Sequence, residues 1–204
     1  MKLFFAPGAC SLSPHIVMRE LGLDFTPVKV DLTTKTTAEG ADFNAISVHG
    51  YVPAIQLDDG RVLTEGPAIV QFLADQKPEA GLAPKAGTWE RYELQETLNF
   101  ISTEIHKQFS PLFNAANPDS VKDAQKAKLA HRFDQIEPTL AKQPYLTGEQ
   151  FSVADAYLFT VLGWSKYFNI DLNRWPGIAS FVERTAARPA VAEALAFEAQ
   201  AKKG

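Results

Sequence analysis

The residue with the clearest chemical potential is the chain's single cysteine, Cys10, which lies between an apolar opening segment and a helix start at Ser11-Leu-Ser13-Pro14. A lone thiol cannot form an intrachain disulfide, so redox or nucleophilic work needs a partner from outside the chain. The positive end of a helix favours a thiolate over a thiol. A single cysteine is more often a small buried apolar residue, but this position favours a chemical role.

A second group of residues, Glu65 and Gly66, lies where a hairpin ends and a helix begins, in Thr64-Glu65-Gly66-Pro67. Backbone N–H groups at a helix start bind carboxylates, and the Glu65 carboxylate can accept from an ammonium group. The pair therefore predicts recognition of the two charged ends of an amino acid. Electrostatic stabilisation of the helix start by Glu65 is the alternative.

Asn99, Thr103 and His106 follow one another at intervals of four and three residues, so they share one face of a helix. They can converge on one ligand, and a neutral histidine ring can donate to a thiolate or move a proton near neutral pH. Glu104 and Lys107 lie on the same turns, and a solvated polar face is the alternative.

Three further positions are candidates for ligand binding or catalysis. Val52-Pro53 precedes a strand, and because only ~5–6% of such bonds are cis in folded proteins, the residues alone favour trans. A cis bond would present the Val52 backbone to an extended peptide. Lys35 lies in a polar stretch, where it is either solvated or a carboxylate clamp. His15, one turn into the first helix, is a weaker candidate than His106 for the same role.

The elements that position these residues fall into two parts. A segment with two prolines and two glycines, residues 77–87, has the composition of a linker. We place a first domain at 1–80, the linker at 81–87 and a second domain at 88–204.

The first domain is predicted to be α/β. A strand at 3–6, a helix at 14–20 and a strand at 26–31 predict a βαβ unit with parallel strands. Asp58-Asp59-Gly60 predicts an antiparallel hairpin between strands at 54–57 and 61–63. A helix at 67–75 follows.

The second domain is predicted to be helical throughout. The apolar stripe of one long helix is formed by Leu94, Leu98, Ile101, Ile105, Phe109 and Leu112. Ser152-Val-Ala-Asp155 has capping-box spacing before an apolar, central helix. The other predicted helices cover 121–140, 178–188 and 189–199, and residues 201–204 form a frayed tail. Aromatic residues could line a pocket, although helical spacing favours the core: Phe109, Phe113, Trp164 and Tyr167.

Composition excludes several classes of protein. The 204 residues are 46% hydrophobic and 22% charged, which is typical of a globular protein. With 20 basic and 24 acidic residues and no long basic run, binding to nucleic acid is not expected. The N-terminal apolar stretch soon meets Pro7 and Gly8, so neither a signal peptide nor a membrane span is expected, and we predict a cytoplasmic protein. A single cysteine excludes a multi-cysteine metal site.

The order of these features resembles the cytosolic glutathione transferases, and within them the bacterial beta class. The resemblance covers essentially the whole chain and rests on Cys10, Val52-Pro53, Glu65-Gly66 and Ser152-Val-Ala-Asp155. It implies a thioredoxin-like N-terminal domain that binds glutathione and a helical C-terminal domain that bounds the pocket for the second substrate. It also implies that Val52-Pro53 is cis.

Site roles follow from this resemblance residue by residue. It implies that Cys10 and His106 are catalytic and meet the glutathione sulfur. The implied glutathione-binding residues are Lys35, Val52, Pro53, Glu65, Gly66, Asn99, Thr103 and Glu104, the last three partly from a neighbouring subunit, so a homodimer is implied. Many relatives have Ser where this chain has Gly66, and we expect binding with somewhat reduced affinity.

The function implied is conjugation of the glutathione thiolate to small apolar electrophiles, including aryl or alkyl halides, with glutathione as co-substrate and no prosthetic group or metal. Because cysteine is a weak hydrogen-bond donor, His106 is the better candidate for lowering the pKa of the sulfur. Cys10 is predicted to add thiol–disulfide exchange through a mixed disulfide. The alternatives are a glutathione-dependent disulfide reductase and a non-catalytic binding or regulatory relative.

Overall fold

The computed structural model describes residues 1–203, and Gly204 of the predicted tail lies outside them. The chain divides into two compact units. The first comprises Met1–Ala80 and the segment that begins at Ala187, and the second comprises Gly81–Ala186. The last helix therefore belongs with the first unit, whereas the sequence placed it in the helical domain. Arg188, at the start of this last helix, links it to the rest of the first unit, because its Nε–H donates to the Glu20 carboxylate at 2.7 Å.

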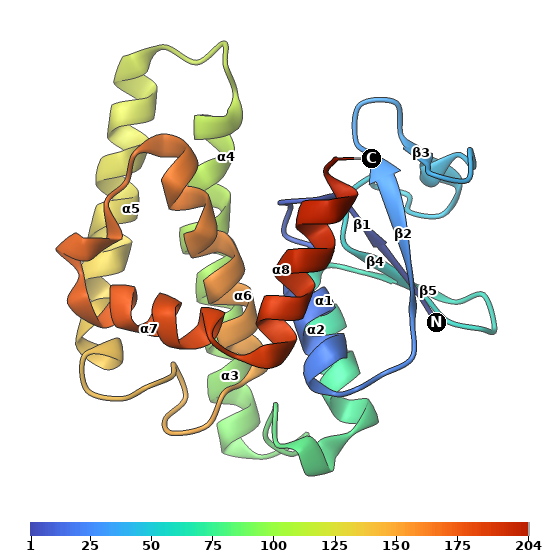
Figure 1. The fold of residues 1–204 in the computed structure, drawn as a ribbon. Coiled ribbons are helices and arrows are strands. Elements are labelled where there is room, and N and C mark those ends of the chain that lie inside the picture. Colours follow the sequence, from blue (N-terminus) through green and yellow to red (C-terminus); the bar gives the residue numbers. More distant parts are fainter. Residues whose placement is uncertain (204) are drawn as a thin grey trace. The chain divides into compact units, whose positions relative to one another are not determined.

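Within residues 1–203, the first unit contains a five-stranded sheet with the order β3-β2-β1-β4-β5 (Figure 1). The strands are β1 (Lys2–Phe5), β2 (Thr26–Asp31), β3 (Thr36–Thr37), β4 (Ala54–Gln56) and β5 (Val62–Thr64). The parallel β1–β2 pair and the antiparallel β4–β5 hairpin were both predicted. The short strand β3 was not, because its polar threonines have no strand pattern.

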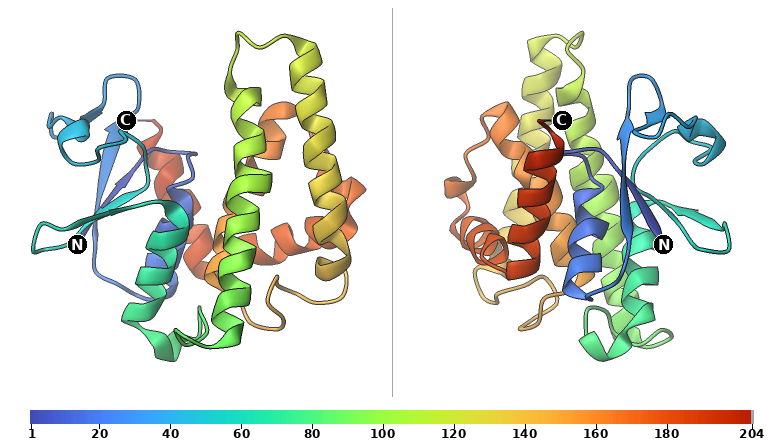
Figure 2. Two further views of the ribbon diagram at one scale, coloured as in Figure 1. Left: turned by 180° about the vertical axis from the view of Figure 1, so that it is seen from behind. Right: turned by 45° about the vertical axis from the view of Figure 1, so that its right-hand side comes forward.

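Both faces of the sheet are covered, which explains the unbroken apolar run in β1. Helices α1 (Leu12–Glu20), α2 (Gly66–Gln76) and α8 (Pro189–Ala201) lie on one face (Figures 1 and 2). Phe5 points to this side, where its ring contacts those of His15 and Phe197. Phe4 points to the other side, where its ring lies 5.5 Å from that of Phe43 in η1 (Phe43–Ala45). A second short helical turn, η2 (Pro78–Ala80), ends the Met1–Ala80 segment.

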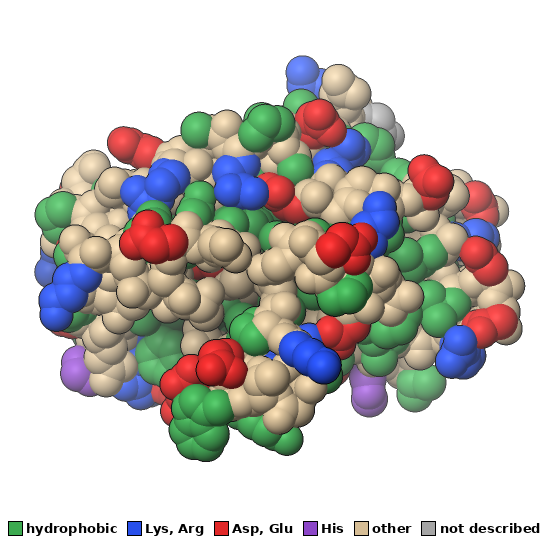
Figure 3. Space-filling view, turned by 90° about the horizontal axis from the view of Figure 1, so that it is seen from below, with side chains coloured by type: hydrophobic (Ala, Val, Ile, Leu, Met, Phe, Trp, Pro, Cys, Tyr) green, Lys and Arg blue, Asp and Glu red, His purple; other side chains and the backbone are tan. Residues whose placement is uncertain are grey.

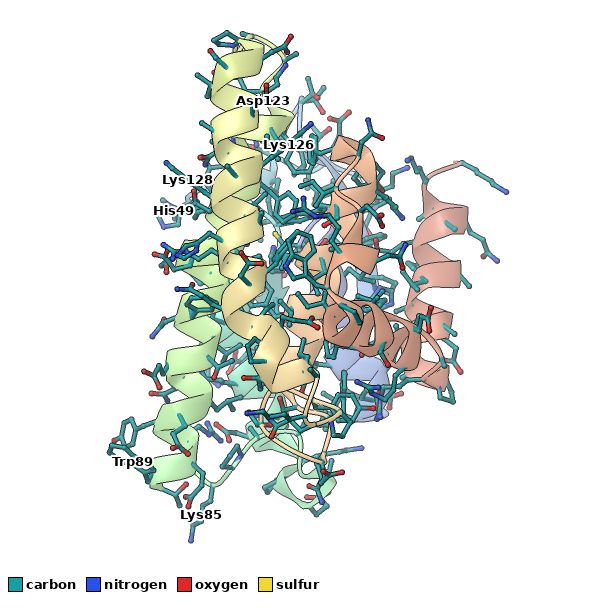
Figure 4. All side chains as sticks on the ribbon, turned by 90° about the vertical axis from the view of Figure 1, so that its left-hand side faces the viewer. His49, Lys85, Trp89, Asp123, Lys126 and Lys128 are labelled. Atoms are coloured by element: carbon teal, nitrogen blue, oxygen red, sulfur yellow. The ribbon has the colours of Figure 1, made fainter. Side chains whose placement is uncertain are left out.

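The second unit begins with the predicted long helix, but this helix changes its winding midway. It runs through α3 (Trp89–Phe100), a π-helical turn η3 (Ile101–His106) and α4 (Lys107–Phe113), beside α5 (Asp119–Leu140) (Figure 2). The predicted apolar stripe is buried along its whole length. Charged side chains, among them Asp123, Lys126 and Lys128, project from α5 (Figure 4), as its sparse apolar positions predicted.

The remaining elements are α6 (Val153–Leu162), η4 (Gly163–Phe168), η5 (Leu172–Arg174) and α7 (Pro176–Ala186). The predicted capping box is present at the start of α6, where the Asp155 carboxylate accepts from Ser152 N–H at 2.8 Å. Burial raises the pKa of Asp155 to about 6. Every residue of α6 is buried, so this helix is the centre of the second unit.

None of the helices described is long and apolar enough to cross a membrane. Within residues 1–203 no group of three or more His, Cys, Asp or Glu side chains could hold a metal ion. Acidic and basic side chains are interspersed over the face shown in Figure 3.

Candidate active site

Cys10 lies two residues before the first residue of α1, half-buried, in the turn that leaves β1. Its thiol donates to the Val52 carbonyl, with Sγ 3.3 Å from the oxygen. Val52 and Pro53 are buried, and the peptide bond between them is cis, as the resemblance implied and in contrast to the base rate for such bonds. The structure thus brings two of the predicted residues into direct contact across 42 positions of sequence.

Glu65 and Gly66 open helix α2 as expected. Glu65 is exposed at the N-cap with φ +67°, a left-handed conformation that costs a non-glycine residue energy and that clusters at ligand sites. Gly66 is the first helical residue, so its amide is one of the N–H groups at the helix start that have no partner within the helix. Pro67, the next residue, has no N–H. A Cβ atom on Gly66 would meet only Pro53 Cγ, at 3.9 Å.

Lys35 is held rather than freely solvated. Its backbone has φ +57°, its Nζ donates to the Gly50 carbonyl at 2.9 Å, and its ammonium lies 5.5 Å from the centre of the Tyr51 ring. Tyr51 is 68% exposed. The lysine charge is therefore fixed at the surface between a carbonyl and an aromatic face, where it can meet a carboxylate.

His106 is the last residue of the π-helical turn in the second unit, and such turns are frequent at functional sites. Its Nδ1 lies 2.6 Å from the Tyr157 hydroxyl oxygen, and its ring packs edge-on against Trp164 with centroids 4.9 Å apart. Burial, followed by the adjacent Lys107 charge, lowers the pKa of His106 to about 4. The ring is therefore neutral at physiological pH.

Asn99, Thr103 and Glu104 lie on the same stretch of helix as His106. Asn99 and Thr103 are exposed, and the Thr103 hydroxyl donates to the Asn99 carbonyl at 3.0 Å. Glu104 is paired with Arg132 of α5, with 2.5 Å between the charged atoms. The predicted polar face exists, but the Thr103 hydroxyl and the Glu104 carboxylate already have partners within the second unit.

Comparison with known proteins assigns the chain to a family. A glutathione S-transferase N-terminal domain model matches residues 8–76, and a glutathione S-transferase C-terminal domain model matches residues 100–189. Glutathione S-transferase GstA of Escherichia coli O157:H7 is 45% identical over 198 residues, which are 97% of this chain and 98% of the relative. The chain belongs to the glutathione S-transferase family.

Solved structures narrow the assignment of this transferase. The ternary complex of BphK, a bacterial GST, has a TM-score of 0.96 at 57% identity and covers 98% of this chain and 100% of that one. A bacterial beta-class glutathione S-transferase of Sphingomonas chungbukensis has a TM-score of 0.94 at 45% identity, with 97% and 98% covered. These likenesses confirm the predicted beta-class resemblance and the predicted fold. The protein is a glutathione transferase, with glutathione as its co-substrate.

The sequence missed two residues that hold the cysteine loop of the transferase. Ser11 Oγ accepts from Ala6 N–H at 3.1 Å and donates to the Ala6 carbonyl at 3.3 Å. The buried Glu198 carboxylate of α8 accepts from Gly8 N–H at 2.8 Å. Ser11 was visible only as part of a helix start, and nothing in the pattern of α8 marked Glu198.

His15, the weaker histidine candidate, is part of the core of the first unit. Its side chain is fully buried, and its ring is surrounded edge-on by Phe25 and Phe197. Its Nε2 accepts from Arg19 Nε–H at 2.9 Å. His15 is therefore a buried side chain of this unit, with Nε2 bonded to Arg19.

The aromatic residues divide into two pairs. Phe109 and Trp164 are buried, as the helical spacing favoured, and their rings pack at 84°. Phe113 and Tyr167 are 54% and 50% exposed, so they are not core residues. The Trp164 ring contacts the ring of His106 and also the rings of Phe109 and Phe113.

Proposed function

We propose that this transferase conjugates glutathione to small apolar electrophiles, including aryl or alkyl halides. The observation that carries the proposal is the neutral, half-buried His106, anchored by Tyr157 on a π-helical turn. A neutral imidazole can donate an N–H to a thiolate without being consumed as a base. Its pKa of about 4 keeps this state throughout the physiological range.

Glutathione recognition is assigned to the first unit. The backbone at Val52, next to strand β4, pairs with the extended tripeptide. The amide of Gly66 and the carboxylate of Glu65 take the α-carboxylate and the ammonium of the γ-glutamyl end. Lys35, already held at the surface by Gly50 and Tyr51, takes a second carboxylate. These groups match the charges of the tripeptide one for one.

The conjugation step needs no residue to become covalently bound. The glutathione sulfur attacks the carbon that carries the halogen, a C–S bond forms, and the halide leaves with the bonding electron pair. The thiol proton passes to solvent before attack. Hydrogen bonds that stabilise the thiolate raise the fraction of reactive sulfur at neutral pH.

Thiol–disulfide exchange is the second proposed activity, and the accessible side of the half-buried Cys10 favours it. The Cys10 thiolate attacks a mixed disulfide of glutathione, which releases the substrate thiolate and leaves Cys10 bonded to glutathione. A second glutathione thiolate then attacks this bond, yields glutathione disulfide and restores Cys10. In the net exchange the incoming glutathione sulfur is oxidised and the substrate sulfur is reduced to a thiolate, while the glutathione of the mixed disulfide ends in glutathione disulfide.

The test of both activities is a comparison of purified wild type with Cys10→Ala and Cys10→Ser. Turnover is measured with an activated aryl halide and with a mixed disulfide. We expect wild type to conjugate, both variants to retain most conjugation, and both to lose disulfide reduction. A wild-type protein that neither binds immobilised glutathione nor conjugates the halide would refute the proposed function. Cys10→Ser controls for the hydrogen bond to Val52, because its hydroxyl can donate but cannot form a disulfide.

We also propose that the protein is a homodimer in the cytoplasm. Two aromatic side chains on α3, Trp89 and Tyr92, are 74% and 58% exposed, and large exposed apolar groups often mark an interface. A single free thiol is typical of a reducing compartment. Sedimentation equilibrium should give twice the chain mass, and Trp89→Asp with Tyr92→Asp should lower the association constant.

A further inference from the structure

The Tyr157 hydroxyl and His106 Nδ1 are 2.6 Å apart, which is a short hydrogen bond between two side chains of the second unit. Tyr157 lies on α6 and is 2% exposed, whereas His106 ends the π-helical turn η3. The two rings also meet nearly at right angles, at 80°. The contact therefore fixes both the position and the orientation of the histidine ring.

The direction of this hydrogen bond decides which ring nitrogen carries the proton. Either the phenol donates to Nδ1 and the hydrogen is on Nε2, or Nδ1–H donates to the phenol oxygen and Nε2 is bare. A phenol is a stronger acid than a neutral imidazole N–H, and an imidazole nitrogen is a stronger base than a phenol oxygen. The phenol-to-Nδ1 direction is therefore the stronger bond, and it places the hydrogen on Nε2.

Tyr157 cannot readily move away from this position. All residues of α6 are buried, and the Ser152–Asp155 capping box fixes the start of the helix one turn before Tyr157. On its other side the His106 ring packs against Trp164, with centroids 4.9 Å apart. A ring held between two buried aromatic side chains has little freedom to flip or to exchange its partner.

Charges around His106 favour its neutral state. The adjacent Lys107 opposes a second positive charge, and burial has the larger effect in the same direction. From α5, Arg132 faces this turn, but it is paired with Glu104. From α6, the facing polar group is the Tyr157 hydroxyl, which is hydrogen-bonded to Nδ1. The ring is thus a neutral donor rather than a cation.

We propose that Tyr157 is a positioning residue that holds His106 as the Nε2–H tautomer, so that the ring donates to the glutathione thiolate instead of removing the thiol proton. This inference rests on the proposed function, in which His106 meets the glutathione sulfur. The thiolate is then stabilised before the electrophile arrives, and the thiol proton leaves to solvent. A bare Nε2 would instead act as a base and would offer the thiolate no donor.

The tautomer can be measured without any reaction. In protein labelled with ¹⁵N-histidine, chemical shifts distinguish a protonated ring nitrogen from a bare one. We expect His106 of the wild type to show a bare Nδ1 and a protonated Nε2 at pH 7. A protonated Nδ1 with a bare Nε2 would overturn the proposal, whether or not the enzyme conjugates glutathione.

The consequence for the sulfur is tested with Tyr157→Phe, which keeps the ring contact and removes only the hydroxyl. In a Cys10→Ala background the protein has no thiol of its own, so ultraviolet absorbance of the thiolate reports bound glutathione alone. We expect Tyr157→Phe to mix the tautomers and to raise the pKa of the bound thiol by about one pH unit. We also expect kcat to fall about tenfold, less than removal of a catalytic donor itself costs, with KM for glutathione unchanged.

Tyr145→Phe is the matched control, because it removes another buried phenol hydroxyl from the same unit. It should leave the His106 shifts and the thiol pKa as in wild type. An unchanged thiol pKa in a folded Tyr157→Phe protein would overturn the proposal. A wild type that shows the Nε2–H tautomer but does not conjugate glutathione would refute the proposed function instead, so the two failures are distinguishable.

Discussion

Replacing Gly66 with serine should strengthen glutathione binding. A Cβ atom at this position meets only Pro53 Cγ, at 3.9 Å, which is ordinary van der Waals contact, so the side chain fits without displacing its neighbours. The new hydroxyl lies at the start of α2, where we assign the γ-glutamyl carboxylate. A hydrogen bond to a charged group contributes about 1.5 to 3 kcal/mol, which is roughly a 10- to 150-fold lower Kd.

Titration calorimetry with glutathione measures this change directly. Gly66→Ala is the matched control, because it adds the same Cβ without the hydroxyl, and we expect its Kd to stay within about twofold of wild type, since no charge-assisted bond is added. The decisive comparison is serine against alanine. Equal affinities for these two variants would refute the assignment of the γ-glutamyl end to this helix start, even if both differ from wild type.

Two further predictions concern stability. Gly177→Ala should lower the free energy of unfolding by about 3 kcal/mol, because its Cβ would lie 2.6 Å from the Ala141 nitrogen and would push α7 from the Glu137 carboxylate that accepts from Gly177 N–H. The same change at Gly163, where an added Cβ would meet no atom of another part of the chain within 4 Å, should raise stability by about 0.4 to 1 kcal/mol. Urea unfolding compares the two variants, and equal effects would contradict the reasoning. His106 has a folded pKa of about 4, below its unfolded value, so its contribution is present above pH ~6.5 and is lost as the pH falls through 4, at most about 3 kcal/mol. Wild type should therefore lose more stability than His106→Gln over this range, and parallel curves would contradict a neutral buried ring.

The sequence predicted the elements whose formation depends on local pattern. The stripe from Leu94 to Leu112 is buried as predicted, and Asp58-Asp59-Gly60 joins an antiparallel pair. Capping at Ser152 and Asp155 also follows from spacing alone. These features depend on residues a few positions apart, and their energies are largely decided within one element.

The residues that hold the site in place were not predictable in this way. Glu198 and Gly8 are 190 positions apart, and Tyr157 and His106 are 51 apart. Tyrosine in an apolar run indicates a buried ring, but the direction of its hydroxyl is set by the packing of α6. The π-helical turn has no sequence signal that we could recognise, and the apolar face of α8 does not specify which unit it will cover.

The hydrogen bond from Gly8 to Glu198 also has a consequence for the newly made chain. A ribosome delivers Gly8 early and Glu198 190 residues later, which at about 5–20 residues per second is a delay of roughly ten to forty seconds. During synthesis, Gly8 in the turn that carries Cys10 therefore cannot bond to the Glu198 carboxylate until that residue has been made. The thiol loop therefore gains this hydrogen bond only after α8 has been synthesised and has left the ribosome.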